Sequence, residues 1–315
     1  MTKFRNILLA LHGKDNEEKA IRRAFALAKN NKAKLTVVDV LEELPIKMKD
    51  LLKIVSVQEL EEAAIKERLS DIKGLIKSAE AKTRIKAETK VLVGKPQIEI
   101  IKEVLRNNND LVMKTPEGKG TRRLTLFGTI DINLMRKCPC PVWMVKPSKS
   151  IKYSRILAAV DPDPFERVRN ELNKEIMELA VSISQSEKSE LHIVHAWRLW
   201  GESALRGLRV RASEAEMNRL LQATRNFHKR WLDNLLAEFP LANLEHKVHL
   251  RKGDPGILIP DIAKKERIDL IVMGTVCRTG IPGLIIGNTA ESVLNQVDCS
   301  LLTVKPYRFI SPIKA

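Results

Sequence analysis

Short apolar runs alternate with longer amphipathic stretches along the whole chain. Runs such as Ile7–Leu11 and Ile156–Val160 lack the polar alternation of a half-exposed strand, so they predict strands that are buried on both faces. Between such runs, apolar residues recur at helical spacing, as Ala20, Ile21 and Ala24 do. This alternation predicts an α/β chain whose parallel strands are covered by helices on both faces.

The same succession of elements is expected in each half of the chain. The predicted strands of the first half are Ile7–Leu11, Lys34–Val40, Lys86–Val93, Leu111–Met113 and Val142–Lys146. Those of the second half are Ile156–Val160, Leu191–Ala196, Glu245–Arg251, Leu270–Met273 and Leu301–Lys305. The predicted helical segments are Glu17–Asn30, Pro45–Ala81, Ile98–Arg106, Glu166–Ser184, Trp197–Phe239 and Ile257–Lys265. With right-handed crossovers, each half becomes a doubly wound, Rossmann-like domain with a five-stranded parallel sheet.

The two halves also repeat one another in sequence. Asp110–Met113 recurs as Asp269–Val272, 159 residues later. A repeat of this length has the size of an ordinary domain and is too long for a solenoid unit. We therefore predict two domains, residues 1–149 and 150–315. The short polar linker Pro147–Lys152 is expected to hold them against each other.

A candidate site follows from the residues at the strand ends. Ligands of open parallel sheets bind beyond the carboxyl ends of the strands, where we expect the first and fourth strands of each half to be neighbours. In the second half this edge carries Asp161 and Gly274, and a helix begins near Gly287 and Asn288. Glycines let an anion approach the backbone, and a helix start attracts phosphate. An ordinary helix start capped by Asn288 explains the same residues equally well.

Two Rossmann-like copies with this loop resemble the tandem universal stress proteins over essentially the whole chain. The nucleotide motif of that family is Gly, two residues, Gly, nine residues, Gly, then Ser or Thr. The second copy keeps the spacing from Gly274 to Asn288, but Cys277 replaces the second glycine and Asn288 replaces the hydroxyl residue. The first copy has Thr115 in place of the first glycine.

The resemblance implies a site for ATP or another adenine nucleotide, with Mg²⁺. The matching residues of the second domain are Asp161, Ala196, Met273, Gly274, Gly287, Asn288 and Thr289. Those of the first domain are His12, Val40, Lys114, Thr115, Gly118, Gly128 and Thr129. Because His12 replaces the aspartate and Thr115 adds a side chain beside the backbone, the first domain is the less favoured site.

Composition narrows the classes of function. The formal charge of +16 attracts anions, but aromatic residues make up only 4% of the chain and there is no dense basic tract. Nucleic acid is therefore the least favoured partner.

No apolar run has the length of a membrane span, so we expect a cytoplasmic protein. No paired carboxylates, nucleophile–base pair or metal motif stands at a strand end, which favours a non-enzymatic role in ligand sensing or interaction. Slow ATP hydrolysis and a homodimer are left open.

The long middle segments suggest an alternative function. Each contains apolar residues among cations: Met48, Leu51, Leu52, Ile54 and Val55 in the first, and Leu199, Trp200, Leu205, Leu208 and Val210 in the second. We expect these segments to pack the two copies together. The alternative is a nucleotide-free scaffold that binds a protein partner or an apolar ligand, such as a lipid, through them.

Histidine and cysteine residues provide two further candidates. Two pairs, His192/His195 and His246/His249, fall on neighbouring predicted strands. Residues three apart on a strand face opposite sides, so only one member of each pair can meet across the strands. We interpret them as structural. Cys138-Pro139-Cys140 suggests a thiol site, although Cys140 matches Cys299 in the repeat and then fits a small buried residue.

Overall fold

The structure, a computed structural model, describes residues 4–13, 16–43, 56–118, 127–148, 150–207, 212–275, 287–307 and 309–315. The strands of the first half are β1 (Asn6–Ala10), β2 (Lys34–Leu41), β3 (Glu88–Val93), β4 (Leu111–Lys114) and β5 (Val142–Met144). Its helices are α1 (Glu18–Asn31), α3 (Val57–Thr83), α4 (Pro96–Asn107) and α5 (Thr129–Lys137). These bounds confirm the predicted strands to within a few residues.

The second half repeats this arrangement. Its strands are β6 (Arg155–Ala159), β7 (Glu190–Trp197), β8 (His246–Lys252), β9 (Leu270–Gly274) and β10 (Ser300–Val304). Its helices are α6 (Arg167–Glu187), α7 (Glu202–Arg206), α8 (Glu214–Leu236), α9 (Pro255–Lys265) and α10 (Asn288–Leu294). Even the turns repeat, because the glycines that follow β3 and β8 both adopt positive φ, +140° at Gly94 and +144° at Gly253.

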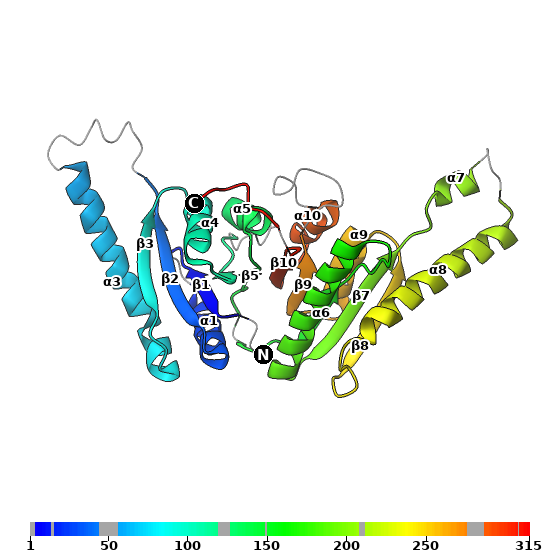
Figure 1. Ribbon diagram of the computed structural model, residues 1–315, viewed down its shortest axis with the longest axis horizontal. Coiled ribbons are helices and arrows are strands. Elements are labelled where there is room, and N and C mark those ends of the chain that lie inside the picture. Colours follow the sequence, from blue (N-terminus) through cyan, green and yellow to red (C-terminus); the bar gives the residue numbers. More distant parts are fainter. Residues whose placement is uncertain are drawn as a thin grey trace.

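The two halves share one sheet. Within the described residues its strand order is β3-β2-β1-β4-β5-β10-β9-β6-β7-β8, and all neighbours are parallel except β5 and β10. Each half is therefore the predicted doubly wound parallel unit, and an antiparallel junction joins the two (Figure 1). Two apolar cores cover the faces of the sheet. Each core contains residues of both halves, such as Ile7 with Ile193 on one face and Leu8 with Val194 on the other.

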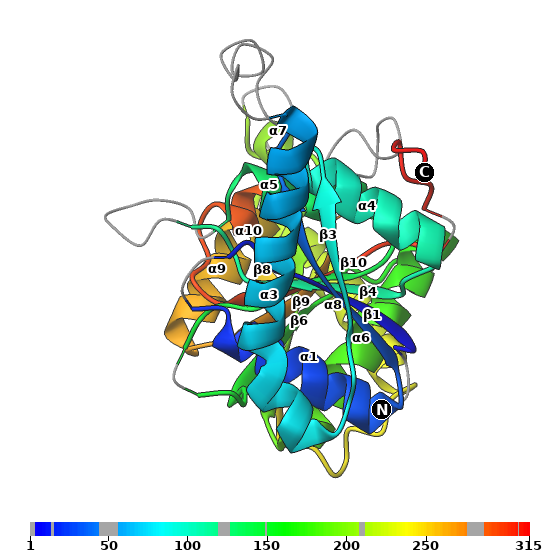
Figure 2. The same ribbon diagram turned by 90° about the vertical axis from the view of Figure 1, so that its left-hand side faces the viewer.

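The long middle helices lie at the two ends of the sheet, which contradicts the expectation that they pack the copies together. Helix α3 lies along β2 and β3, and α8 contacts β7; Figure 1 shows them at opposite ends of the molecule. In Figure 2, which faces the outer end of the first half, α3 and β3 lie in front. The apolar cluster of residues 48–55 and Leu208 and Val210 fall outside the described residues.

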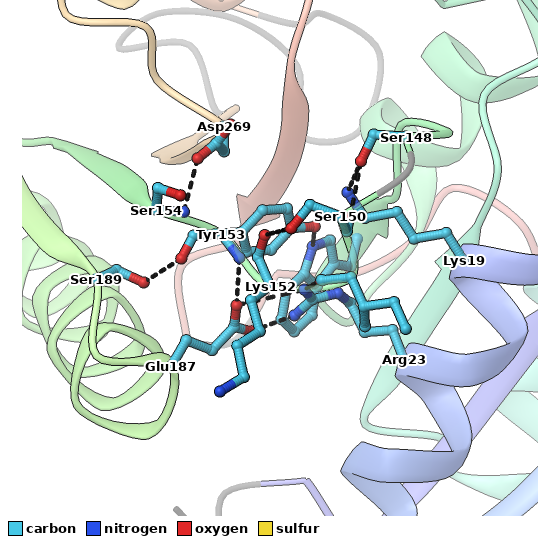
Figure 3. A network of polar contacts seen from close by, with 12 residues as sticks. Lys19, Arg23, Ser148, Ser150, Lys152, Tyr153, Ser154, Glu187, Ser189 and Asp269 are labelled. Carbon is cyan, nitrogen blue, oxygen red and sulfur yellow. Dashed lines mark hydrogen bonds and ion pairs between the residues drawn. The ribbon is translucent and has the colours of Figure 1, made fainter.

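A polar network beside the linker completes the contact between the halves (Figure 3). Arg23 of α1 is buried, pairs with Glu187 at the end of α6 and donates to the carbonyl of Ile151. Its guanidinium lies 3.9 Å from the ring centroid of Tyr153, and the Tyr153 N–H donates to Glu187 at 2.6 Å. Because each buried charge has a partner, this network fixes α1 of the first half against α6 of the second.

Candidate functional site

The first and fourth strands of each half are direct neighbours, as the sequence predicted. Ala10 of β1 lies opposite Lys114 of β4, and Ala159 of β6 lies opposite Met273 of β9. The residues that follow these strands therefore share one carboxyl edge in each half. The order of the strands reverses at this place, which is where open α/β sheets bind ligands.

The second half brings several of its predicted site residues to this edge. Val194 of β7 also pairs with Ala159, so Ala196 and Asp161, each two residues further on, reach the level of Thr275, just beyond Met273 and Gly274. The Asp161 side chain is 40% exposed. Its position is fixed from α6, because the Asp161 N–H donates to Asn173 Oδ1 at 2.9 Å and Arg169 lies 3.6 Å from the carboxylate.

The opposite wall of this edge is the start of α10. Gly287 is the N-cap residue, and its N–H donates to the carbonyl of Thr275 at 3.2 Å. The expected cap by Asn288 is wrong: Asn288 is the first helical residue and is exposed, and no described side chain forms a cap hydrogen bond. Thr289 follows in the same turn. The first turn of α10 thus presents backbone N–H groups and the positive end of a helix dipole.

Gly274 has a packing role beside any role in binding. A Cβ at this position would lie 2.7 Å from Leu172 Cδ2 of α6, so a larger residue would require the Leu172 side chain to shift. The packing of α6 therefore favours a small residue at Gly274, with or without a ligand. Cys277, the residue that departs from the glycine motif, lies outside the described residues.

The corresponding edge of the first half is filled by its own charges. Lys114, which is 1% exposed, ends β4, and its ammonium lies 2.9 Å from Asp131 Oδ1 and 3.3 Å from Glu117 Oε1. The other oxygen of Asp131 accepts the N–H groups of Gly128 at 2.9 Å and of Glu117 at 2.8 Å. A carboxylate of the chain thus occupies the helix start where a phosphate would bind in a nucleotide site.

A second group of charges lies below the end of β1. The Glu17 side chain accepts the N–H of His12 at 2.9 Å and lies 3.4 Å from the His12 ring. Burial raises the pKa of Glu17 to about 7, although the His12 hydrogen bond opposes that shift. On β2, Asp39 pairs with Arg68 of α3 at 3.2 Å. Burial raises the pKa of Asp39 and Arg68 lowers it in part.

Arg68 also covers the end of β1. Its guanidinium lies over Gly13, where a Cβ would approach Arg68 Nη1 to 2.0 Å. The residue that the resemblance places at the nucleotide, His12, is therefore enclosed between Glu17 and the α3 helix. Val40 and Thr115 lie at this edge too, half-buried and buried. Gly118 follows β4 and is half-buried, and Thr129 is the exposed first residue of α5.

Sequence reasoning named Lys114 at the first edge but missed its partners, Asp131 and Glu117. Asp131 carries the clearest signal that was available. At the 159-residue register, Lys114 corresponds to Met273 and Asp131 to Ala290, so two buried charges of one copy are apolar in the other. Lys114 was among the matched site positions, but the motif has no position for Asp131, so a comparison restricted to motif positions overlooks the partner of Lys114.

The histidines form two pairs. His192 Nδ1 and His249 Nε2 lie 2.9 Å apart across β7 and β8, so one member of each predicted pair does meet its counterpart. His195 instead contacts His228 of α8 at 2.8 Å, a partner that strand spacing did not predict. Burial lowers the pKa of His192, His228 and His249. The described part of the chain contains no cluster of three or more His, Cys, Asp or Glu residues placed to hold a metal ion.

Comparisons with known proteins agree with this architecture. The family model of the universal stress proteins matches residues 3–146 and 152–305. The universal stress protein E homolog of Haemophilus influenzae is 29% identical over 96% of this chain and 98% of its own length. Universal stress protein E of Escherichia coli K12 is 28% identical over 100% of this chain and 98% of its own.

Solved structures show the same fold. A universal stress protein of Pseudomonas aeruginosa superimposes with a TM-score of 0.69 at 24% identity, covering 97% of this chain and 94% of that one. One from Archaeoglobus fulgidus gives 0.61 at 20% identity, covering 95% and 98%. Among the described helices, none is long and apolar enough to cross a membrane. With both halves matched over nearly their full length, the chain belongs to the universal stress protein family as a tandem, E-type member.

Proposed function

We propose that this protein is a non-enzymatic, cytoplasmic sensor of the stress response whose second domain binds an adenine nucleotide with Mg²⁺. Family membership supports the stress-response role. The observation that favours the second domain is the contrast at the helix starts. Asp131 fills the first helix start, whereas α10 has no side-chain cap among the described residues. The division into residues 1–149 and 150–315 belongs to this proposal.

Each part of the nucleotide has a proposed partner in the second domain. The N–H groups of Asn288 and Thr289 suit the phosphates, because a helix start stabilises negative charge, and Gly287 adds no side chain at that helix start. Asp161, which is partly exposed, suits the ribose hydroxyls or the base as an acceptor, and its carboxylate is a candidate ligand for Mg²⁺. Ala196 and Met273 supply the small and apolar surface against which the base packs.

Ligand analysis gives the first test. Protein purified without added nucleotide is denatured, and the released small molecules are identified by mass spectrometry. The same protein is titrated with ATP and Mg²⁺ and followed by calorimetry and thermal unfolding. We expect binding and a rise in Tm. The absence of both, up to millimolar nucleotide, would exclude the proposal.

Three variants locate the site. Asp161→Ala removes a hydrogen-bonding charge, which we expect to weaken binding by at least about tenfold. Gly287→Val places a branched side chain at the helix start and should have a similar effect. His12→Ala, at the position of the first domain that matches Asp161, serves as the control and should leave the affinity unchanged. Equal losses in all three variants would argue against a site in the second domain.

Exposed apolar residues favour one alternative, a scaffold without nucleotide. On and beside α8, Phe165 is 87% exposed, Phe227 49% and Leu220 40%. Such a surface suits a protein partner or an apolar ligand. Under this alternative, Phe227→Ser abolishes capture of the partner or lipid and leaves nucleotide binding unaffected. The release analysis distinguishes the two functions directly, because it identifies nucleotide, lipid or neither.

A further inference from the structure

Cys138 and Cys140 form a thiol pair that the proposed nucleotide site does not use. Both cysteines are free and buried, and their Sγ atoms lie 3.5 Å apart. A disulfide needs a separation of about 2 Å between sulfurs, so the two sulfurs must move about 1.5 Å closer to form the bond. Cys138 ends helix α5 and Cys140 leads into β5, with Pro139 between them.

A buried lysine of the other half lies beside this pair. Lys305 is 5% exposed, and its ammonium donates to the carbonyl of Arg136 at 3.1 Å and to Thr275 Oγ1 at 2.7 Å. The ring of Phe309 covers it at 4.7 Å. No carboxylate within the described ranges forms an ion pair with Lys305. Burial lowers the pKa of Lys305 to about 7, and the charge of Cys138 opposes that shift.

The electrostatics of the two cysteines differ. Burial raises the pKa of Cys138, but hydrogen bonds from the thiol and backbone N–H of Cys140, together with the charge of Lys305, bring it below its ordinary value. The pKa of Cys140 is raised, because its thiol donates to Cys138 and because it is buried. The carboxyl end of α5 disfavours a thiolate at Cys138. Lys305 offsets this effect, since it binds a carbonyl of that same helix end.

We propose that Cys138 and Cys140 are a peroxide-sensitive dithiol centre, with Cys138 the attacking thiolate and Cys140 the resolving thiol. The Cys138 sulfur attacks a peroxide oxygen, so that the S–O bond forms, the O–O bond breaks and hydroxide leaves to become water. Cys140 then attacks the Cys138 sulfur. The S–S bond forms, the S–O bond breaks, and the departing hydroxide takes the Cys140 proton as a second water. Two thiols are oxidised and one peroxide is reduced.

Burial decides which oxidant suits this centre. Cys138 is 0% and Cys140 8% exposed, so a bulky disulfide such as oxidised glutathione has no direct path to the sulfurs. Hydrogen peroxide is small enough to enter through a local opening of the short connection between α5 and β5. Reactive thiols are usually more exposed than these, and for that reason the rate, and not only the product, must be measured.

Cys299 serves as an internal reference for the rate of thiol oxidation. Cys299 is the repeat equivalent of Cys140 and lies in the same kind of buried position, but burial raises the pKa of its thiol to about 12. Folded protein is exposed to hydrogen peroxide, free thiols are alkylated at timed intervals, and tryptic peptides are analysed by mass spectrometry. Trypsin cleaves after Lys137, so one peptide carries both Cys138 and Cys140.

We expect that peptide to lose both alkylation sites together and to become lighter by the mass of two hydrogen atoms. This should happen at least about tenfold faster than any oxidation of Cys299, because the pKa of Cys138 is lowered and that of Cys299 is raised. In Cys140→Ala, Cys138 should stop at the sulfenic acid, which a 1,3-diketone traps. Oxidation of Cys138 at the rate of Cys299, or oxidation of the pair without a disulfide, would overturn the proposal.

The role of Lys305 is tested separately. Lys305→Met should slow oxidation of Cys138 by about tenfold, since a neighbouring positive charge lowers a thiol pKa by about one unit or more. Lys146 is its repeat equivalent, and its ammonium instead contacts Asp298 at 2.7 Å. Lys146→Met is therefore the matched control and should leave the rate unchanged. Equal rates of Cys138 oxidation in both variants would show that Lys305 does not activate Cys138. The comparison of Cys138 with Cys299 is made in the unaltered protein, so it does not depend on the folding of either variant.

Discussion

The carboxyl edges of the two halves have the same arrangement of strands and helices, but the buried side chains at the first edge are charged and those at the second are apolar. In the first half, Lys114 and Asp131 form a buried ion pair at the helix start. In the second half, Met273 and Ala290 occupy the same repeat positions. The fold therefore does not by itself determine whether a ligand site exists. Two buried side chains decide whether the helix start holds an anion of the chain or is left for an external one.

The first edge shows how a duplicated site becomes structural. A phosphate and a carboxylate are both anions that accept N–H groups, so Asp131 can replace a ligand at the start of α5 without disturbing the helix. Lys114 then neutralises the carboxylate inside the core. The binding energy that a ligand would supply on binding becomes a permanent part of folding stability.

The largest expected effect follows from separating this pair. Lys114→Met leaves Asp131 and Glu117 without their cation, and a buried charge without a partner costs about 3–5 kcal/mol. We expect denaturant unfolding to show a loss of that size. The triple variant Lys114→Met, Glu117→Val, Asp131→Ala reproduces the residues of the second half. It should recover more than half of the loss, and a triple variant as unstable as the single one would contradict the comparison.

The pH dependence of the first edge gives the next largest effect. The pKa of Glu17 is about 7 in the folded state and near its ordinary value of 4.5 in the unfolded state, so folding favours the protonated carboxyl. The contribution of Glu17 to stability is full below pH 4.5 and is lost as the pH rises to about 7, by up to about 3 kcal/mol.

Glu17→Gln keeps the acceptor for the His12 N–H and removes the titration. We therefore expect the free energy of unfolding of the variant to rise relative to that of the wild type as the pH increases from 4.5 to 7. Above that range the difference between the two free energies should stay constant. Glu18→Gln, at an exposed neighbour on the same helix, is the control. Chemical unfolding across this pH range measures both, and parallel curves for wild type and Glu17→Gln would show that Glu17 does not titrate there.

Much of the fold was predictable from local patterns, and the rest depends on contacts between distant segments. Apolar runs and helical spacing located the strands to within a few residues. They also placed the first strand of each half beside the fourth, because the doubly wound order is nearly fixed once the strands are known. The pairing of β5 with β10 was not predicted. Edge strands of two domains carry no local signal for which partner they join.

The candidate site divides in the same way. Asp161 and Gly287 were predictable as residues at one edge, since both follow strands that the repeat identifies. The filling of the first edge was not, because it requires knowing that the side chains of Lys114 and Asp131 meet, 17 residues apart in the chain. The packing of Leu172 against Gly274 was also unforeseen, because the approach of α6 to β9 is a property of tertiary structure alone.

Introducing the carboxylate of the first half into the second half tests the second edge. Ala290→Asp places at the start of α10 the carboxylate that Asp131 supplies to α5. We expect nucleotide affinity to fall at least about tenfold, which corresponds to about 1.4 kcal/mol, because the new anion competes for the same N–H groups. Ala290→Asn has the same size without the charge and serves as the control in calorimetric titration. Equal affinities for the two variants would show that charge at this helix start does not control binding.

The smallest effect concerns Arg68, which covers the first edge from α3. Its side chain is 35% exposed while that of Asp39 is 5% exposed, so Arg68→Ala should cost only about 1 kcal/mol in unfolding experiments. Because Arg68 lowers the pKa of Asp39, the loss should disappear as the pH falls and Asp39 becomes protonated. Lys66→Ala, at an exposed position of the same helix, should show no such loss.

Removing Arg68 uncovers Gly13 but leaves Asp131 on the helix start, so the variant should still bind no nucleotide in its first domain. A new nucleotide site in Arg68→Ala would show that the α3 cover, and not the buried Lys114–Asp131 pair, closes that edge.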